Sequence, residues 1–334
     1  MKNPNLLRAT PDLRALPQRQ TSARDEAAGS DFAQAMLQAL SQRPRSIAPK
    51  FFYDARGSAL FDAICQLPEY YPTRTELGLL AAHAGEMARS IGAQAEIVEF
   101  GAGSSRKVRL LLDALEQPRR FLPIDISGEH LQAAMAPLRR DYPALDVQVV
   151  VGDFTRELEL PAVQPGARRV GFFPGSSIGN FTPEEARDFL RHAAVLLRGG
   201  GLLIGVDLVK DPGLLHAAYN DAAGVTAAFN LNLLARANRE LGTDFDLAQF
   251  AHYAFYEPRQ QRIEMHLLSR RAQAVNFGGQ RFEFDEGESL HTENSYKYTV
   301  EGFQALAAQA GFEPGPVWCD AQRLFSVHWL EAAA

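Results

Sequence analysis

The stretch VEFGAGSSRK, residues 98–107, decides the fold that we expect for this chain of 334 residues. An apolar run ends near the acidic Glu99, breaks into Gly101 and Gly103, and passes into a helix-forming segment. Glycine lets the chain turn sharply and lets a ligand touch the backbone, while the next helix offers unpaired N–H groups. Such a loop, at the carboxyl edge of a parallel strand, is typical of a nucleotide-binding site.

Apolar runs and helix-period segments alternate around this loop. We expect strands at 95–100, 120–126, 146–154, 168–175 and 200–209, separated by helices at 105–115, 128–140 and 183–197. Strands separated by helices form a parallel sheet with both faces covered. A helix within 299–314 and a hairpin of strands at 315–319 and 323–330 would finish the sheet. The sequence therefore predicts an α/β, Rossmann-like domain with a mostly parallel sheet and a terminal hairpin.

The pattern changes between Asp211 and Ser295, which indicates an inserted α+β domain. A long helix is expected from Thr226 to about Leu241, stopped by Gly242, with strands at 251–257 and 262–275. The predicted organisation is a loose N-terminal arm at 1–30, a discontinuous substrate-binding domain at 31–75 and 211–295, and a cofactor-binding domain at 76–210 and 296–334.

Composition excludes several classes of function. A net charge of −6 and a pI near 5.8 argue against a nucleic-acid partner, and no apolar run is long enough for a transmembrane helix. Cys65 and Cys319 lie far apart, and the eight histidines show no HxH or HExxH spacing, so we expect neither a disulfide framework nor a metal. A monomer in the reducing cytoplasm, with small-molecule ligands, is expected.

The residues around the glycine loop favour S-adenosylmethionine over a dinucleotide. A GxGxxG fingerprint needs a third glycine that permits tight packing of the helix against the strand, and Arg106 stands at that position. In the ExGxG variant, Glu99 can help to neutralise an ammonium group such as that of S-adenosylmethionine. Asp125, at the end of the next strand, is placed to accept the ribose hydroxyls, and Asp153 with Phe154 could hold the adenine. Aspartates that merely cap helices are the competing interpretation.

A rival motif is GSSIG, residues 175–179, which fits the hydrolase pattern GxSxG with Ser177 as nucleophile. A nucleophile elbow passes directly from strand to helix through the serine. Here Thr182, Pro183 and Glu185 signal the next helix several residues later. The sequence therefore disfavours a hydrolase.

Four segments together resemble one known family. They are FFYDARGSALFDAICQLPEYYPTRTE (51–76), EFGAGSSRK (99–107), FFPGSSIGNF (172–181) and HTENSYKY (291–298). Through them the chain is similar to the histidine-specific methyltransferases of ergothioneine biosynthesis over nearly its whole length after residue 30. The resemblance implies a class I methyltransferase domain with a second substrate-binding domain. It also implies transfer of three methyl groups in turn from S-adenosylmethionine to the α-amino group of L-histidine, giving hercynine.

The resemblance also implies roles for individual residues. Tyr53 would lie beside the cofactor and the reacting amine, and Tyr70 would reach toward the imidazole. Asn180 and Tyr219 would hold the amino acid, chiefly its carboxylate, and Tyr53 and Asn180 are the expected catalytic residues. The remaining matches fall into two sets. Those around the cofactor are Gly101, Lys107, Asp125, Asp153 and Phe154. Those around the substrate are Gly175, Met265, Glu293 and Ser295. Tyr53 and Tyr70 could instead be ordinary half-buried tyrosines with a solvated hydroxyl, Tyr219 could pack one domain against the other, and Met265 could fill the core.

Glu293 and Ser295 have an argument of their own. Residues two apart on an extended strand point to one face, so an acid and a hydroxyl would meet one ligand there. The resemblance implies that this pair reads the imidazole ring. Two alternatives stay open: a methyltransferase acting on another aromatic amino acid such as tryptophan, and a noncatalytic protein that only binds the cofactor.

Overall fold

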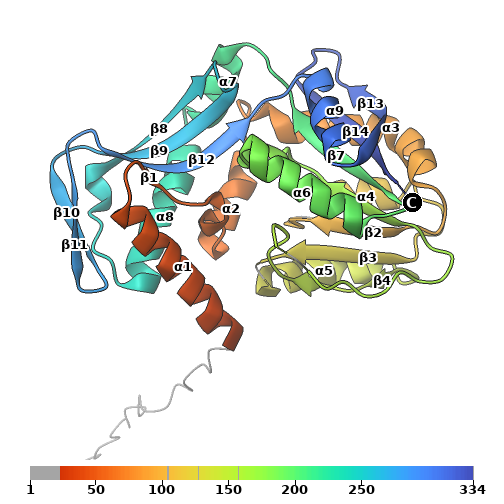
Figure 1. The fold of residues 1–334 in the computed structure, drawn as a ribbon, viewed down its shortest axis with the longest axis horizontal. Helices are drawn as coiled ribbons and strands as arrows, with labels where there is room; N and C mark the ends of the chain where they lie inside the picture. The colour runs from red at the N-terminus through yellow and green to blue at the C-terminus, as the bar shows by residue number, and fades with distance from the viewer. Residues whose placement is uncertain (1–22, 104, 127, 157, 334) are drawn as a thin grey trace, which may run out of the picture.

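The computed structural model describes residues 23–333 apart from 104, 127 and 157, and its largest feature is an eight-stranded sheet (Figure 1). The strand order is β13-β14-β7-β6-β2-β3-β4, with β5 also paired to β3. The bounds are β2 (Glu96–Phe100), β3 (Arg120–Asp125), β4 (Asp146–Val147), β5 (Val150–Val151), β6 (Arg169–Phe173), β7 (Gly201–Asp207), β13 (Phe312–Cys319) and β14 (Phe325–Ala332). The strands from β7 to β4 pair in parallel, whereas β14 is antiparallel to β7 and to β13. The predicted α/β fold with a terminal hairpin is confirmed.

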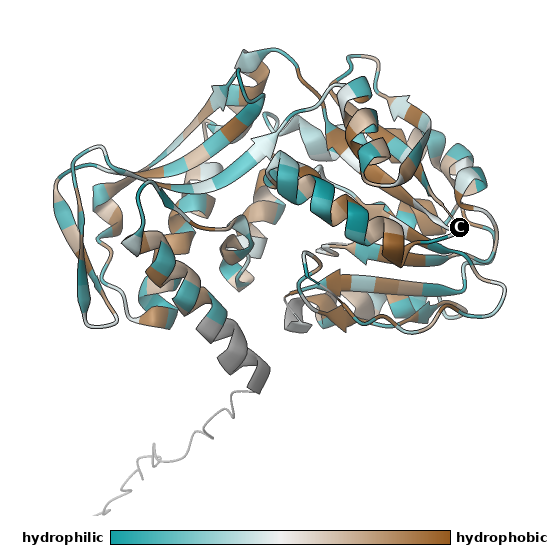
Figure 2. Cartoon of the chain, in the orientation of Figure 1, coloured by the Kyte–Doolittle hydropathy of each residue, from teal (hydrophilic) through white to brown (hydrophobic). Residues whose placement is uncertain are grey.

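Helices cover both faces of this sheet. One face carries α3 (Tyr71–Ile91), α4 (Arg106–Leu112) and α5 (Gly128–Asp141), and the other carries α6 (Pro183–Leu196) and α9 (Val300–Gln309). Successive residues of a strand point to opposite faces, so Ile97 of β2 joins the first core and Val98 the second. This is why β2, β6 and β7 are buried throughout. Away from the sheet, α6 turns a mostly hydrophilic side outward (Figure 2).

Local sequence signals fix the ends of two helices. The Thr182 side chain accepts a hydrogen bond from the Glu185 backbone, and the Glu185 carboxylate accepts one from the Thr182 N–H, which closes a capping box at the start of α6. Ser177 lies earlier, in the 3-10 turn η2 (Ser177–Asn180), so it is not at a strand-to-helix elbow. The helix α8 (Val225–Leu241) ends at Gly242, whose φ of +68° favours glycine.

A second sheet has four strands in the order β1-β12-β9-β8. Its strands are β1 (Arg45–Ser46), β8 (Phe250–Glu257), β9 (Arg262–Ser269) and β12 (Ser289–Tyr296), and β10 (Gln273–Phe277) with β11 (Gln280–Phe284) forms a separate hairpin. The elements around it are α1 (Ala23–Ser41), α2 (Ala55–Ile64), α7 (Pro212–Tyr219), α8 and the turns η1 (Pro49–Phe52) and η3 (Leu247–Gln249). Their buried residues, from 32–71 and 215–290, share one core. The domain boundaries themselves stay a prediction.

Some elements differ from the sequence prediction. The helix α1 begins at Ala23, inside the arm that we expected to be loose, because its alanine-rich segment has high helix propensity; residues 1–22 lie outside the described residues. The strand expected at 262–275 is broken after Ser269, whose hydroxyl donates to the carbonyl of Arg271 in a tight turn. The strand expected at 146–154 is split into β4 and β5. None of the helices in the described part is long and apolar enough to cross a membrane.

Candidate active site

The carboxyl ends of three neighbouring strands converge on one large pocket. It is lined by the predicted cofactor residues at or after the carboxyl ends of β2, β3 and β5, which are Glu99, Gly101, Gly103, Lys107, Asp125, Asp153 and Phe154. The N–H groups of Gly101 and Ala102 both donate to the Ile124 carbonyl at 2.9 Å, which holds the loop against β3. Gly101 has φ +72°, and a Cβ there would lie 3.4 Å from the Phe154 ring. A side chain at position 101 would therefore occupy the space beside that ring.

Glu99 is buried at this edge without a full set of partners. Its side chain is 2% exposed, and its Oε2 atom has no hydrogen-bond partner among the described residues. Burial raises the pKa of Glu99 to about 8, against the opposing charge of Lys107. An acidic oxygen that lacks a donor suits a ligand with an ammonium group, so the residues here fit S-adenosylmethionine.

This burial predicts a pH-dependent gain in stability for Glu99→Gln. The folded pKa of about 8 lies above the ordinary 4.5, so the wild-type residue favours folding below pH 4.5 and loses that contribution as the pH rises through 8. Without added cofactor, we expect the variant to be more stable than wild type at pH 9 by on the order of 3 kcal/mol, and nearly equal near pH 4.5. Urea unfolding at both pH values measures this; an equal difference at both contradicts it.

A buried glutamate, which was not predicted from the sequence, connects Lys107 after the cofactor loop to Gly175 in the substrate pocket. Glu76, in α3, is 1% exposed and accepts hydrogen bonds on both oxygens from the Gly175 N–H at 2.9 Å. Its Oε2 atom also lies 2.6 Å from the Lys107 ammonium. Glu76 thus fixes one predicted cofactor residue and one predicted substrate residue. The only signal in the sequence was an acid inside an otherwise amphipathic helix.

Asp153, predicted to hold the adenine, is already held by protein groups. Its Oδ1 atom accepts from the N–H and the hydroxyl of Thr155 at 3.0 and 2.5 Å. Its Oδ2 atom accepts from Lys50 at 2.9 Å, and Lys50 also contacts Asp31 of α1 at 2.9 Å. These contacts orient the carboxylate at the pocket wall, beside Phe154.

A second, smaller pocket adjoins the first. Most predicted substrate residues line it, together with a few that were not predicted: Tyr53, Phe61, Tyr70, Pro72, Gly175, Ser176, Ser177, Asn180, Asp207, Tyr219, Glu293 and Ser295. Met265 is the exception, because it lies opposite Glu293 on β9, is 2% exposed and packs into the core without lining either pocket. Seven residues line both pockets, namely Tyr53, Phe61, Tyr70, Gly175, Ser177, Asn180 and Glu293.

Three ionisable groups of the smaller pocket, Glu293, Tyr53 and Tyr70, are shifted toward their neutral forms. Burial raises the pKa of Glu293 to about 7, although the charge of Lys297 opposes this. Burial also raises the pKa values of Tyr53 and Tyr70 well above the ordinary range, with the charge of Glu293 adding to the effect. Phenols that stay protonated can donate hydrogen bonds here but cannot act as ionised bases.

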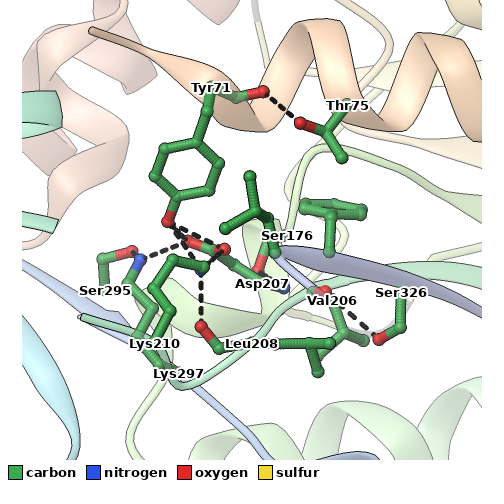
Figure 3. A network of polar contacts seen from close by, with 12 residues as sticks. Tyr71, Thr75, Ser176, Val206, Asp207, Leu208, Lys210, Ser295, Lys297 and Ser326 are labelled. Atoms are coloured by element: carbon green, nitrogen blue, oxygen red, sulfur yellow. Dashed lines mark hydrogen bonds and ion pairs between the residues drawn. The ribbon is translucent and has the colours of Figure 1, made fainter. Parts of the chain in front are cut away.

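One lining residue of the smaller pocket, Asp207, belongs to a buried network of charges (Figure 3). Asp207, at the end of β7, is 1% exposed and contacts both Lys210 and Lys297, the latter at 2.8 Å. The Tyr71 hydroxyl lies 2.8–2.9 Å from both Asp207 oxygens. Burial would raise the pKa of Asp207, but the charges of Lys297 and Lys210 outweigh it and the pKa is lowered. The sequence analysis missed these four residues because their pairing joins distant parts of the chain.

One group of described residues could hold a metal ion. Glu264 and His266 of β9 and His291 of β12 have potential ligand atoms within 4.8 Å of one another. Protein groups already bond to them: Glu264 accepts from Arg262, and His291 Nε2 lies 3.0 Å from the Glu293 carbonyl. The two imidazole rings also contact each other, with centroids 4.8 Å apart and planes 34° from parallel. The expected absence of a metal stays a prediction.

Comparison with known proteins agrees with this geometry. The profile of the family described as "Histidine-specific methyltransferase, SAM-dependent" matches residues 32–332. The histidine N-alpha-methyltransferases of Mycolicibacterium smegmatis and Mycobacterium tuberculosis are 46% and 43% identical, each over 84% of this chain and 88% of the relative. Ergothioneine biosynthesis protein 1 of Neurospora crassa is 32% identical over 82% of this chain and 32% of that protein.

Proposed function

Because this chain belongs to the family of histidine-specific, S-adenosylmethionine-dependent methyltransferases, we propose that it methylates the α-amino nitrogen of L-histidine three times to give hercynine, the first step of ergothioneine biosynthesis. It is an N-methyltransferase that uses S-adenosylmethionine as methyl donor. The substrate is supported by the names of its relatives, and the number of methyl groups by the resemblance of its motifs.

One observation carries the proposal. Glu293 and Ser295 line the smaller pocket, and Glu293 belongs also to the large pocket with Glu99 and Asp125. A ligand whose ring meets Glu293 and Ser295 can therefore extend its amino group toward the cofactor. An acid beside a hydroxyl is suited to an imidazole, which can donate from one nitrogen and accept at the other.

The proposed roles are those that the resemblance implies, and the lining of the two pockets supports them. On the cofactor side, Glu99 faces the ammonium, Asp125 the ribose, and Asp153 with Phe154 the adenine. On the substrate side, Asn180 and Tyr219 hold the carboxylate, and Tyr70 contacts the far side of the ring. Tyr53 lies beside the amine. All of these residues, on both sides, line one or both of the two pockets. Met265 supports Glu293 from the core.

Methyl transfer needs positioning more than a nucleophile from the protein. The α-amino nitrogen attacks the methyl carbon, the C–S bond breaks, and S-adenosylhomocysteine leaves. Holding the two reactants in line can supply several kcal/mol. An α-amino group has a pKa of about 8 in model peptides, so the amine must lose a proton before each attack. Tyr53 and Tyr70, whose pKa values burial raises, are poor acceptors for this proton.

A screen of free amino acids tests the substrate. The protein is incubated with S-adenosylmethionine and each amino acid separately, and the products are read by mass spectrometry. We expect L-histidine to be methylated fastest, and tryptophan and phenylalanine to be methylated far more slowly. Methylation of tryptophan with histidine unchanged would overturn the substrate, and binding of S-adenosylhomocysteine without any product would overturn the enzyme itself.

A further inference from the structure

Lys297 is a buried cation directly behind the wall of the smaller pocket. It follows the end of β12 and is 2% exposed. Its ammonium lies 2.7 Å from Ser295 Oγ, 3.3 Å from the Tyr219 hydroxyl and 2.8 Å from Asp207 Oδ2 (Figure 3 shows the Asp207 and Ser295 side). An ammonium has three hydrogens and no lone pair, so these three acceptors satisfy it completely.

The hydrogen bonds that Ser295 already accepts leave its hydroxyl free only to donate. Ser295 Oγ accepts from Lys297 and, at 2.7 Å, from the Tyr219 hydroxyl. A hydroxyl oxygen has two lone pairs, and these two donors fill them. Ser295 is 5% exposed and lines the pocket, so its own O–H is the group that remains for a ligand.

We infer that Lys297 is a positioning residue that fixes Ser295 as a hydrogen-bond donor toward the ligand. Since this rests on the proposed function, the ligand is the ring of L-histidine. With Glu293 as the acceptor and Ser295 as the donor, the pocket takes a neutral imidazole that presents one N–H and one bare nitrogen. The pair selects one tautomer and rejects rings that lack the bare nitrogen.

A lysine is suited to this task because its ammonium group can only donate hydrogen bonds and can never accept one. A water molecule or a third hydroxyl behind Ser295 could accept as well as donate, which would let the serine hydrogen turn away from the ligand. Burial alone would lower the pKa of Lys297, but the charge of Asp207 outweighs it and raises the pKa. The group therefore remains an ammonium at neutral pH.

Lys210 provides a matched control. It also pairs with Asp207, and it donates to the Tyr71 hydroxyl at 2.7 Å, but it has no hydrogen bond to Ser295 or Tyr219. Lys297→Met and Lys210→Met each remove one buried ammonium from the same aspartate. Only the first changes the hydrogen bonds of Ser295.

The test compares three amino acids by calorimetry in the presence of S-adenosylhomocysteine. L-Histidine has both ring functions, 3-(4-thiazolyl)-L-alanine keeps a bare ring nitrogen without an N–H, and L-phenylalanine has neither. We expect wild type and Lys210→Met to bind the thiazole more tightly than phenylalanine by roughly two- to tenfold, as one neutral hydrogen bond predicts. In Lys297→Met this preference disappears, as it does in Ser295→Ala, and the double variant loses nothing more.

The outcomes separate this inference from the proposed function. If wild type methylates histidine but Lys297→Met keeps the thiazole preference, or Lys210→Met loses it equally, the inference is wrong and the function stands. If wild type neither binds nor methylates histidine, the proposed function is wrong. Should Lys297→Met fail to fold, Lys297→Gln replaces it: its amide can still donate to Asp207 but can also accept from Ser295, so the preference should again disappear.

Discussion

We expect Glu293→Ala to lower kcat/KM for L-histidine roughly ten- to a hundredfold while leaving that for L-phenylalanine nearly unchanged. The carboxylate accepts a charge-assisted hydrogen bond from the imidazole N–H, and such a bond contributes about 1.5–3 kcal/mol. Glu293 is only 9% exposed, so little water can replace the lost contact. A site built to pair with a polar group rejects ligands that lack it, so the variant should also discriminate less between the two amino acids.

Steady-state kinetics with both amino acids measure this effect. Glu264→Ala is the matched control, because Glu264 lies on the neighbouring strand opposite Asn294 and lines neither pocket. The affinity for S-adenosylhomocysteine, measured without amino acid, should hardly change in either variant. Equal losses for the two substrates, or no loss for histidine, would mean that Glu293 does not read the ring.

The largest loss of stability is expected from Asp207→Asn, at about 3–5 kcal/mol of the free energy of unfolding. The substitution keeps the shape of the side chain but removes the one negative charge shared by Lys210 and Lys297, both nearly buried. Two ammonium groups would then face each other out of water, and breaking a buried pair leaves an uncompensated charge. Chemical denaturation monitored by circular dichroism gives the value.

Two further variants show whether charge is the cause. Asp188→Asn removes the same group from an exposed ion pair with Arg191 and should change stability by less than about 1 kcal/mol. Adding Lys210→Met to Asp207→Asn removes one of the stranded charges and should recover part of the loss. A double variant no more stable than Asp207→Asn alone would contradict this account.

The alternation of strands and helices could be predicted from the sequence because apolar residues recur with a different spacing in strands and in helices. Strands such as 201–206 are apolar on both faces, and the start of α6 has a complete capping box. Parallel strands bring their carboxyl ends to one edge, which is why Glu99, Asp125 and Asp153 could be placed together. The substrate residues came from the resemblance to a known family, and only Glu293 with Ser295 had a periodicity argument as well.

The supporting residues could not be predicted because they depend on contacts between distant segments. Tyr71, Asp207 and Lys297 meet only once both sheets are assembled, and no local pattern in the sequence indicates that they pair with one another. A bulge between His291 and Glu293 shifts the register of β12, so that Thr292 and Glu293 are both buried, contrary to simple alternation. Met265 shows that the resemblance to a family has its own limit: a residue matched in this way can support a pocket from behind without lining it.

The most direct test of the whole account is the structure of the product formed from L-histidine and S-adenosylmethionine with an isotopically labelled methyl group. Tandem mass spectrometry of the final product gives both the number of labelled methyl groups and the nitrogen that carries them. The account predicts three, all on the α-nitrogen and lost together as trimethylamine on fragmentation. Labelled methyl on the imidazole ring, or histidine recovered without label, would contradict it.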